Sequence, residues 1–349
     1  MSVRLRVVVA APLARELCEL LTTLEPRIEL VVDQSLLPPM RHPADFSGDP
    51  SFRRTPEQQT AYEKMIDTAD ALYGIPDVDA AALARTVRAN PMLRWVHTMA
   101  AGGGGQVRAA HLTASELERV AFTTSAGVHG DALAEFAVFG VFAGAKHLPR
   151  LVGQQRDREW SGRWMMSQVA DQTVLVLGLG GIGAAVAAKL AALGATVIGT
   201  TRSGASLPGV ARTVHPDDVA EVLPHVDAVV STLPGTDATH HLVGREFLSA
   251  LKPGATVVNV GRGTVVDESA LLDGLDADVV GFAALDVFEV EPLPAESPLW
   301  GHPRVLVSPH TAALDAREDR RIAELFAENA SRLLDGLPMR NLVDTVEFY

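Results

Sequence analysis

The stretch that most restricts the fold is "TVLVLGLGGIGAAVAAKLAALGATVIG", which spans residues 173–199. It predicts a buried strand, a tight glycine turn, an alanine-rich helix and a second strand. In such a unit the first glycine permits the turn, the second lets the backbone approach a pyrophosphate, and the third lets helix and strand pack closely. The helix N-terminus then faces the phosphates. We therefore expect a dinucleotide-binding unit whose cofactor turn contains Gly178, Gly180, Gly181, Ile182 and Gly183.

The end of the second strand indicates which dinucleotide is bound. An acidic residue there accepts hydrogen bonds from the adenosine ribose, but this chain has Thr201, Arg202 and Ser203 instead. A guanidinium binds a phosphate in bidentate fashion, and a serine hydroxyl can donate to it. These three residues predict NADP(H) as the preferred cofactor. Use of NAD(H) stays open, because an arginine after a strand can also be simply solvated.

Length and charge narrow the class of protein. The chain has 349 residues, enough for two domains that each bury a core, and its 43 acidic residues outnumber 30 basic ones. This balance argues against nucleic acid or an anionic membrane as a partner. The single cysteine, Cys18, cannot form an intrachain disulfide, and no apolar run is long enough to cross a membrane. We read the N-terminus as a buried strand and not a signal peptide, and we expect a cytoplasmic protein without a metal site.

Short apolar runs alternate with helical patterns along most of the chain, which is typical of an α/β fold with parallel doubly wound sheets. Residues 38–60 do not follow this alternation: they form a polar, proline-rich segment that we interpret as a surface loop or a flap near the active site. Residues 131–148 predict a helix with little polar face, buried in a domain or at a subunit interface. An amphipathic helix precedes Gly336 near the C-terminus.

Three charged residues follow predicted strands of the second α/β region. Arg262 follows "TVVNVG", Glu291 follows "VVGFAALDVFEV", and His310 closes "RVLVSP". Ligands of doubly wound sheets bind beyond the carboxyl ends of the strands. There the arginine can bind a substrate carboxylate, the histidine can give a proton to a carbonyl oxygen, and the glutamate can orient the imidazole and favour its protonated form. Each residue alone could instead be an ordinary loop charge, cap or loop histidine.

These segments together resemble the D-isomer-specific 2-hydroxyacid dehydrogenase family, over most of residues 70–315. "VNVGRGTVVDESALLDGL", "GFAALDVFEVEPLPAESPLW" and "VLVSPHTAAL" are similar to the family's segments with the substrate-binding arginine, the acidic partner and the catalytic histidine. The resemblance assigns these roles to Arg262, Glu291 and His310, whereas Glu289 fits the acidic position less well. It also places further residues near the cofactor: Leu233, Pro234, Thr239, Val260, Gly261 and Asp286.

The segment "LRWVHTMAAGGGGQV" is similar to the family's substrate-domain loop. The resemblance implies that the backbone N–H groups of Ala101 and Gly102 bind the substrate carboxylate. Gly103 and Gly104 replace the family's usual Val and Asp, which leaves the rigidity of the loop and the shape of the substrate open. "TTSAGVHGDALAEFAVFG" resembles the family's interdomain helix, with Phe136 where His is common, and so implies a homodimer.

The family's layout implies two Rossmann-like or flavodoxin-like lobes, with the nucleotide-binding domain inserted in a discontinuous substrate domain. Applied to this chain, residues 1–122 and 313–349 form the substrate domain and residues 123–312 the dinucleotide-binding domain. The expected activity is reduction of a 2-ketoacid to a D-2-hydroxyacid by NADPH, in a cleft that closes around the substrate. The substrate's side chain stays open; residues near Ala101, Met99 or the 38–60 segment could select it.

Two alternatives remain. One is an NAD-linked dehydrogenase of the same family, similar to phosphoglycerate dehydrogenase, although Arg202 fits NAD poorly. The other is a cofactor-sensing binding protein similar to the transcriptional corepressors of this superfamily. A resemblance to formate dehydrogenases is disfavoured, because that group lacks the Glu–His pair that Glu291 and His310 would form.

Overall fold

The computed structural model describes residues 4–42, 44–346 and 348, and the chain forms two compact units. Unit 1 contains residues 1–129 and 314–349, and unit 2 contains residues 130–313. The sequence placed these boundaries after residues 122 and 312. Residues 1–3, 43, 347 and 349 fall within the expected ranges but lie outside the described part of the chain.

Unit 1 is built on a parallel sheet with the strand order β2-β1-β3-β4-β5. Its strands are β1 (Leu5–Val9), β2 (Ile28–Val31), β3 (Ala71–Tyr73), β4 (Trp95–His97) and β5 (Ala121–Thr123). Its helices are α1 (Arg15–Leu24), α2 (Pro56–Ile66), α3 (Ala80–Ala89), α4 (Gly104–Ala109), α5 (Ala114–Arg119) and α11 (Glu318–Leu334). The order reverses between β1 and β3, which is the switch point of a flavodoxin-like sheet.

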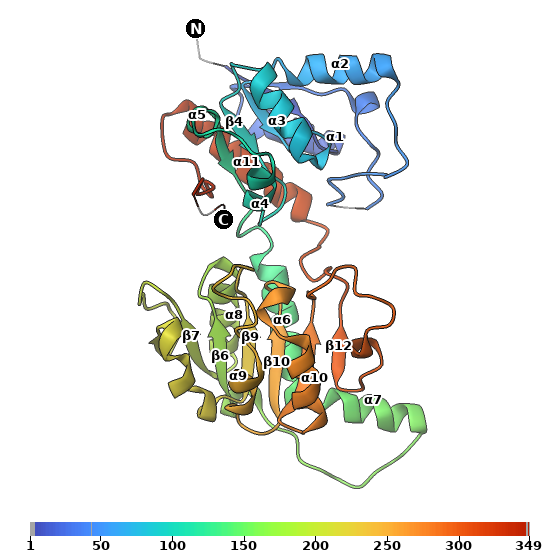
Figure 1. The fold of residues 1–349 in the computed structure, drawn as a ribbon, viewed down its shortest axis with the longest axis vertical. Helices are drawn as coiled ribbons and strands as arrows, with labels where there is room; N and C mark the ends of the chain where they lie inside the picture. Colours follow the sequence, from blue (N-terminus) through green and yellow to red (C-terminus); the bar gives the residue numbers. More distant parts are fainter. Residues whose placement is uncertain (1–3, 43, 347, 349) are drawn as a thin grey trace. The chain divides into compact units, whose positions relative to one another are not determined.

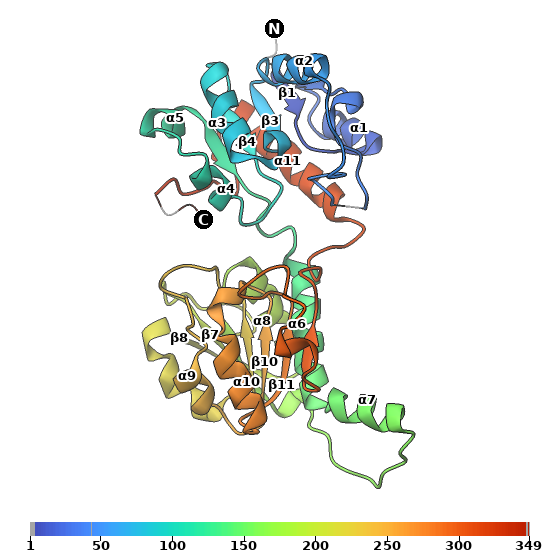
Figure 2. The same ribbon diagram turned by 45° about the vertical axis from the view of Figure 1, so that its right-hand side comes forward.

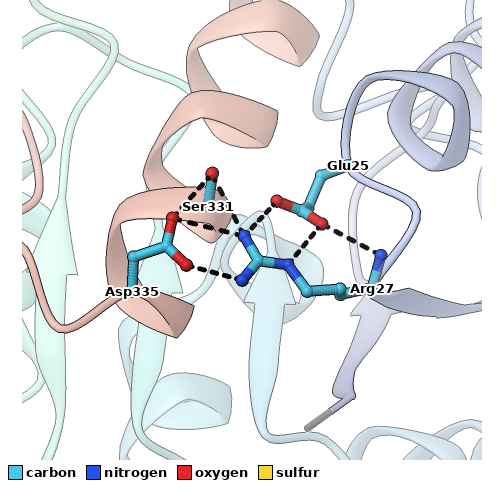
Figure 3. A network of polar contacts seen from close by, with 4 residues as sticks. All are labelled: Glu25, Arg27, Ser331 and Asp335. Atoms are coloured by element: carbon cyan, nitrogen blue, oxygen red, sulfur yellow. Dashed lines mark hydrogen bonds and ion pairs between the residues drawn. The ribbon is translucent and has the colours of Figure 1, made fainter. Parts of the chain in front are cut away.

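The C-terminal helix α11 completes the core of unit 1, far from the rest of that unit in sequence (Figure 1). Phe326 is fully buried, stacks on Trp95 of β4 and meets Tyr73 of β3 edge-on. A polar network at the helix end adds to this apolar contact (Figure 3). In it, Arg27 donates to Glu25 at 2.7 Å and to Asp335 of the C-terminal segment at 2.6 Å. The two ends of the chain therefore form one folding unit.

Unit 2 has a longer parallel sheet with the order β12-β11-β10-β9-β6-β7-β8, whose strands are labelled between Figures 1 and 2. Its strands are β6 (Thr173–Leu177), β7 (Thr196–Thr200), β8 (Arg212–Val214), β9 (Ala228–Ser231), β10 (Ala255–Asn259), β11 (Val280–Leu285) and β12 (Val305–Val307). Its helices are α6 (Gly130–Ala145), α7 (Leu148–Asp157), α8 (Gly181–Ala192), α9 (Arg245–Ser249) and α10 (Glu268–Asp276). The expected α/β class with parallel doubly wound sheets is confirmed.

Both faces of this second sheet are covered. Alternate residues of β6 enter different cores: Val174 and Val176 pack with α6 and α8, whereas Leu175 and Leu177 pack with α9 and α10. A strand buried on both sides is apolar at most positions, which explains why the sequence shows near-continuous apolar runs here. The apolar α6 packs against α8, β10 and β11, and its Gly140 and Gly144 allow close approach to β10.

Candidate functional site

The glycine turn after β6 has the conformation that the sequence predicts. Gly178 has φ +89°, a left-handed conformation that favours glycine. Its N–H donates to the Thr200 hydroxyl at 2.9 Å, and its carbonyl accepts from the Thr232 hydroxyl at 2.8 Å. A Cβ on Gly183 would lie 1.9 Å from the Gly178 carbonyl oxygen. The turn is therefore held by both neighbouring strand ends and tolerates no side chain at Gly183.

The N-terminus of α8 is open to a ligand. Helix α8 begins at Gly181, and the first N–H groups of a helix have no partner within it. Gly180 and Gly181 are exposed, and a Cβ on Gly180 would meet no atom within 4 Å. The free N–H groups and the open space fit a pyrophosphate of a dinucleotide.

Thr201, Arg202 and Ser203 form an open turn after β7. The Thr201 and Ser203 hydroxyls lie 3.0 Å apart, and the Ser203 N–H donates to the Thr201 hydroxyl at 3.3 Å. Arg202 and Ser203 are exposed, and β7 pairs directly with β6. This turn therefore lies beside the glycine turn, where the adenosine end of a dinucleotide would be bound.

The loop after β9 lies against the glycine turn. The Leu233 side chain is 2.9 Å from the position of a Cβ on Gly178. Thr239 closes the loop: its hydroxyl donates to the Pro234 carbonyl at 2.6 Å and accepts from the Thr236 N–H at 2.9 Å. The structure thus gathers Leu233, Pro234 and Thr239 on one side of the expected cofactor position.

Arg262 stands on a narrow turn at the end of β10. The Asn259 side chain bridges this turn, accepting from the Gly261 N–H at 3.1 Å and donating to the Arg262 carbonyl at 2.9 Å. A Cβ on Gly261 would lie 2.5 Å from the Leu233 carbonyl oxygen, and one on Gly263 would overlap the Phe288 carbonyl. Both glycines are required by neighbouring backbone, and they flank an arginine whose side chain stays exposed. Val260, just before the turn, is buried.

Glu291 and His310 are in direct contact, although 19 residues separate them. His310 Nδ1 lies 2.7 Å from Glu291 Oε2, and Glu291 Oε1 accepts the Phe288 N–H at 3.0 Å. The carboxylate is thus fixed on one side by backbone and on the other holds the imidazole. Nε2 of His310 has no hydrogen-bond partner in the described part of the chain, and the side chain is half exposed. The ring is oriented, with one nitrogen available to a ligand.

Asp286 holds the segment that carries the histidine. It is fully buried, and its Oδ1 accepts from the Ser308 hydroxyl at 2.5 Å and from the N–H groups of Thr311 and Ala312 at 3.0 Å each. His310, between them, has φ +53°. Oδ2 of Asp286 has no partner among the described residues. An unpaired buried carboxylate oxygen is costly, so this atom fits a hydrogen-bond donor from a bound cofactor.

Unit 1 contains the other predicted carboxylate-binding residues. Ala101 and Gly102 lie between β4 and α4, in a turn closed by the Gly103 N–H, which donates to the Ala100 carbonyl at 3.3 Å. Among the described residues, the N–H groups of Ala101 and Gly102 have no hydrogen-bond acceptor. A Cβ on Gly103 would overlap the Thr98 side chain, so this departure from the family's Val has a local reason.

A second polar cluster lies at the same edge of unit 2, and the sequence did not predict it. Glu268 accepts the Glu289 N–H at 2.8 Å, and Glu289 accepts the Glu268 N–H at 2.9 Å. His241 Nε2 lies 3.2 Å from Glu289. Burial, with the charge of Glu289 added, raises the pKa of Glu268. Glu289 therefore braces the loop and is not the partner of His310; no local pattern indicates this, because the contacts join loops after three different strands.

Two features are absent from residues 4–42, 44–346 and 348. No group of three or more His, Cys, Asp or Glu side chains could hold a metal ion. In the same residues no helix is both long and apolar enough to cross a bilayer.

Comparisons with known proteins agree with this geometry. Residues 138–312 match the family model "D-isomer specific 2-hydroxyacid dehydrogenase, NAD binding domain". Glyoxylate/hydroxypyruvate reductase B of Pectobacterium atrosepticum is 34% identical over 220 residues, which cover 58% of this chain and 65% of that protein. The match therefore spans somewhat less than two thirds of that relative's length.

Solved structures match over nearly the whole chain. A D-isomer specific 2-hydroxyacid dehydrogenase from Xanthobacter autotrophicus Py2, in complex with NADPH and MES, has a TM-score of 0.76 and 29% identity, covering 99% of this chain and 100% of that one. An NADPH-dependent glyoxylate/hydroxypyruvate reductase from Sinorhizobium meliloti, in complex with NADP and sulfate, has a TM-score of 0.74 and 26% identity with the same coverage. The chain belongs to the D-isomer specific 2-hydroxyacid dehydrogenase family.

Proposed function

We propose that the protein reduces a 2-ketoacid to the D-2-hydroxyacid with NADPH as the hydride donor. The observation that carries this proposal is the Glu291–His310 pair, 2.7 Å apart at the same sheet edge as the glycine turn. NADPH, when bound, supplies the hydride that reduces the keto carbon. His310 Nε2 gives the proton that the developing alkoxide needs, and in the reverse direction it accepts this proton.

Glu291 acts through the histidine. Its hydrogen bond to Nδ1 fixes the ring orientation and stabilises the imidazolium by a charge-assisted contact. Glu291 is itself held by the Phe288 N–H, so the pair does not need to reorganise when substrate binds. Asp286 supports the same geometry, because its three hydrogen bonds fix the residues on both sides of His310.

Arg262 is the proposed substrate-binding residue of unit 2. It follows β10, which pairs with β11, and β11 pairs with β12. Arg262, Glu291 and His310 therefore follow three adjacent parallel strands, at one edge of the sheet. A guanidinium there binds a carboxylate through two parallel hydrogen bonds and draws electron density from the adjacent keto group. In unit 1 we assign carboxylate binding to the N–H groups of Ala101 and Gly102, for which the described residues provide no acceptor.

We infer that NADPH is preferred over NADH. The turn after β7 offers an exposed guanidinium and two hydroxyls, with no carboxylate among Thr201, Arg202 and Ser203. The relatives from Xanthobacter and Sinorhizobium were solved with NADPH and NADP. Arg202→Ala should raise the KM for NADPH about tenfold or more, with a much smaller effect on NADH. Equal effects on both cofactors would remove the 2′-phosphate role and favour the NAD-linked alternative.

We also propose a homodimer that uses the arm formed by α7 and residues 158–168. This arm extends from the body of unit 2 (Figures 1 and 2). Trp160 is 101% exposed and Met165 is 91% exposed, and Val152 on α7 is 53% exposed. Large apolar side chains gathered on one protruding segment are typical of an interface. Light scattering after size exclusion should give twice the 37.1 kDa chain mass, and Trp160→Asp with Met165→Asp should shift it toward the monomer.

The direct test of the activity is a panel of 2-ketoacids with NADPH, followed by the absorbance of the reduced cofactor. We expect turnover of at least one ketoacid and its loss in His310→Ala. Tight cofactor binding without turnover of any ketoacid would instead favour a cofactor-sensing binding protein. A cytoplasmic location stays a prediction; the one cysteine, Cys18, is buried and unpaired.

A further inference from the structure

Unit 1 contains a cavity at the switch point of its sheet. Its volume is about 380 Å³, within the size range of small-molecule sites. Ala10 and Pro12, directly after β1, form one part of its lining, and Asp77 and Val78, after β3, form another. Since β1 and β3 are the neighbours between which the strand order reverses, this is where a sheet of this topology binds ligands. The remaining lining belongs largely to residues 38–54.

The part of the lining that comes from residues 38–42 and 44–54 is held by specific side-chain and backbone contacts. Arg54, with a side chain only 7% exposed, donates to the Leu36 carbonyl at 2.6 Å and to Asp77 at 2.7 Å. Its guanidinium lies 3.6 Å from the Tyr62 ring centroid, a cation–π contact. Gly48 has φ +65°, and a Cβ there would overlap the Pro38 ring. These contacts fix the segment that the sequence indicated as a loop or flap, so a ligand would meet a preformed surface.

The cavity shares a sheet edge with the proposed carboxylate-binding turn. The Ala10 N–H donates to the Tyr73 carbonyl at 2.9 Å, and the Gly74 N–H donates to the His97 carbonyl at 3.0 Å. These bonds join the carboxyl ends of β1, β3 and β4, and Ala101 and Gly102 follow β4. β3 lies between β1 and β4 in the sheet, so the cavity, at the ends of β1 and β3, and the turn at Ala101 and Gly102, after β4, follow neighbouring strands at one edge of unit 1. A ligand whose carboxylate is bound at that turn can extend its substituent along this edge toward the cavity.

The lining indicates the chemistry of that substituent. Seven of the thirteen lining residues are apolar: Ala10, Pro12, Pro38, Phe46, Pro50, Phe52 and Val78. The other six are polar or charged: Ser47, Asp49, Arg53, Arg54, Gln59 and Asp77. The charged lining residues balance, with Arg53 and Arg54 against Asp49 and Asp77. Arg54 is paired with Asp77, Arg53 donates to the carbonyls of Pro50 and Phe52, and Asp49 accepts from Ser51. A charged substituent would meet groups of both signs, whereas an apolar one displaces water from aromatic and proline surfaces.

We propose that this cavity binds the substituent of the 2-ketoacid substrate, and that the substituent is large and uncharged, with an aromatic or branched aliphatic part that contacts the phenylalanine and proline side chains of the lining. The inference rests on the proposed reductase activity and sharpens its substrate class. It differs from what the names of the Pectobacterium and Sinorhizobium relatives state, because glyoxylate and hydroxypyruvate would leave most of the cavity to water.

The test compares kcat/KM with NADPH for phenylpyruvate, 4-methyl-2-oxopentanoate and glyoxylate. We expect phenylpyruvate to exceed glyoxylate by at least about tenfold, since even one methylene in an apolar pocket contributes on that order. Ser47→Trp, which places an indole at an exposed lining position, should lower the phenylpyruvate-to-glyoxylate ratio by about tenfold or more. Ala61→Trp is the matched control, because Ala61 is exposed on α2 and does not line the cavity.

The outcomes separate the two claims. If no ketoacid oxidises NADPH, the proposed function fails and the substrate inference with it. If glyoxylate is turned over at least as efficiently as phenylpyruvate, the reductase assignment stands and the inference about the cavity is overturned. A ratio that Ser47→Trp leaves unchanged, or that Ala61→Trp lowers equally, overturns it as well.

Discussion

Replacing Glu291 with glutamine removes the charge beside His310 and nearly preserves the volume of the side chain. The wild-type contact joins Nδ1 and Oε2 at 2.7 Å, in the range of a charge-assisted hydrogen bond. Such bonds contribute about 1.5–3 kcal/mol when shielded from water. Here the glutamate side chain is 34% exposed and the histidine side chain 50% exposed, so solvent screening reduces the contribution. We therefore expect the variant to lose about 1–2 kcal/mol of transition-state stabilisation, which corresponds to roughly a 5- to 30-fold decrease in kcat.

Steady-state kinetics with NADPH and the best ketoacid of the panel would measure this effect. The decrease should appear mainly in kcat, because Glu291 stabilises the proton donor and contacts neither the substrate carboxylate nor the cofactor phosphates in this account. Glu289→Gln is a useful comparison, since Glu289 braces the neighbouring loop and lies against His241 instead of His310. A Glu291→Gln variant with wild-type kcat, or one altered only in KM, would refute the role given to the pair.

Three further substitutions test the substrate-binding role of Arg262, the packing of the glycine turn and the Glu25–Arg27 ion pair. Arg262→Ala should raise the ketoacid KM and lower kcat/KM by about 100-fold or more, because the substrate carboxylate loses a charged hydrogen-bonded partner. The Kd for NADPH should stay within about threefold of the wild-type value, and fluorescence titration of NADPH provides this control. Gly183→Ala should destabilise the protein by about 1–3 kcal/mol and weaken cofactor binding, because its Cβ would lie 1.9 Å from the Gly178 carbonyl oxygen; normal unfolding and binding would contradict the close packing. For Glu25, the hydrogen bonds from Arg27 lower the pKa from 4.5 to about 2, so its contribution of at most about 3 kcal/mol is complete above pH 4.5 and disappears as the pH falls toward 2. Glu25→Gln should therefore lower the free energy of unfolding in urea at pH 7 and lose most of this deficit near pH 3; a pH-independent deficit would count against the ion pair.

The parallel strands were predictable because burial on both faces leaves an unmistakable apolar run. Strand β8 was not among the expected strands: it has three residues, pairs only at the sheet edge and includes the exposed Arg212. The 38–60 segment was expected to be irregular, yet its last residues begin α2, with a capping box between Thr55 and Gln58. The Thr55–Gln58 capping box could have predicted the start of this helix, but the neighbouring prolines and charged residues favoured a loop.

Within the candidate site, residue type and strand end could be read from the sequence, but contacts could not. The sequence indicated that Arg262, Glu291 and His310 follow three strands of one sheet. It did not show that Asp286 holds the residues around His310, because those hydrogen bonds cross from β11 to the segment after β12, 22 to 26 residues away. The cavity of unit 1 was equally hidden, since its lining comes from the ends of β1 and β3 together with the 38–54 segment.

The configuration and amount of the hydroxyacid product would test the proposed transfer of hydride and proton to the ketoacid. Purified protein would be incubated with NADPH and phenylpyruvate, the oxidised cofactor quantified, and the hydroxyacid resolved by chiral chromatography. We expect one D-3-phenyllactate formed for each NADPH oxidised, and a rate lower by about two to four orders of magnitude in His310→Ala. Formation of the L-enantiomer, or a His310→Ala variant that keeps the wild-type rate, would contradict it.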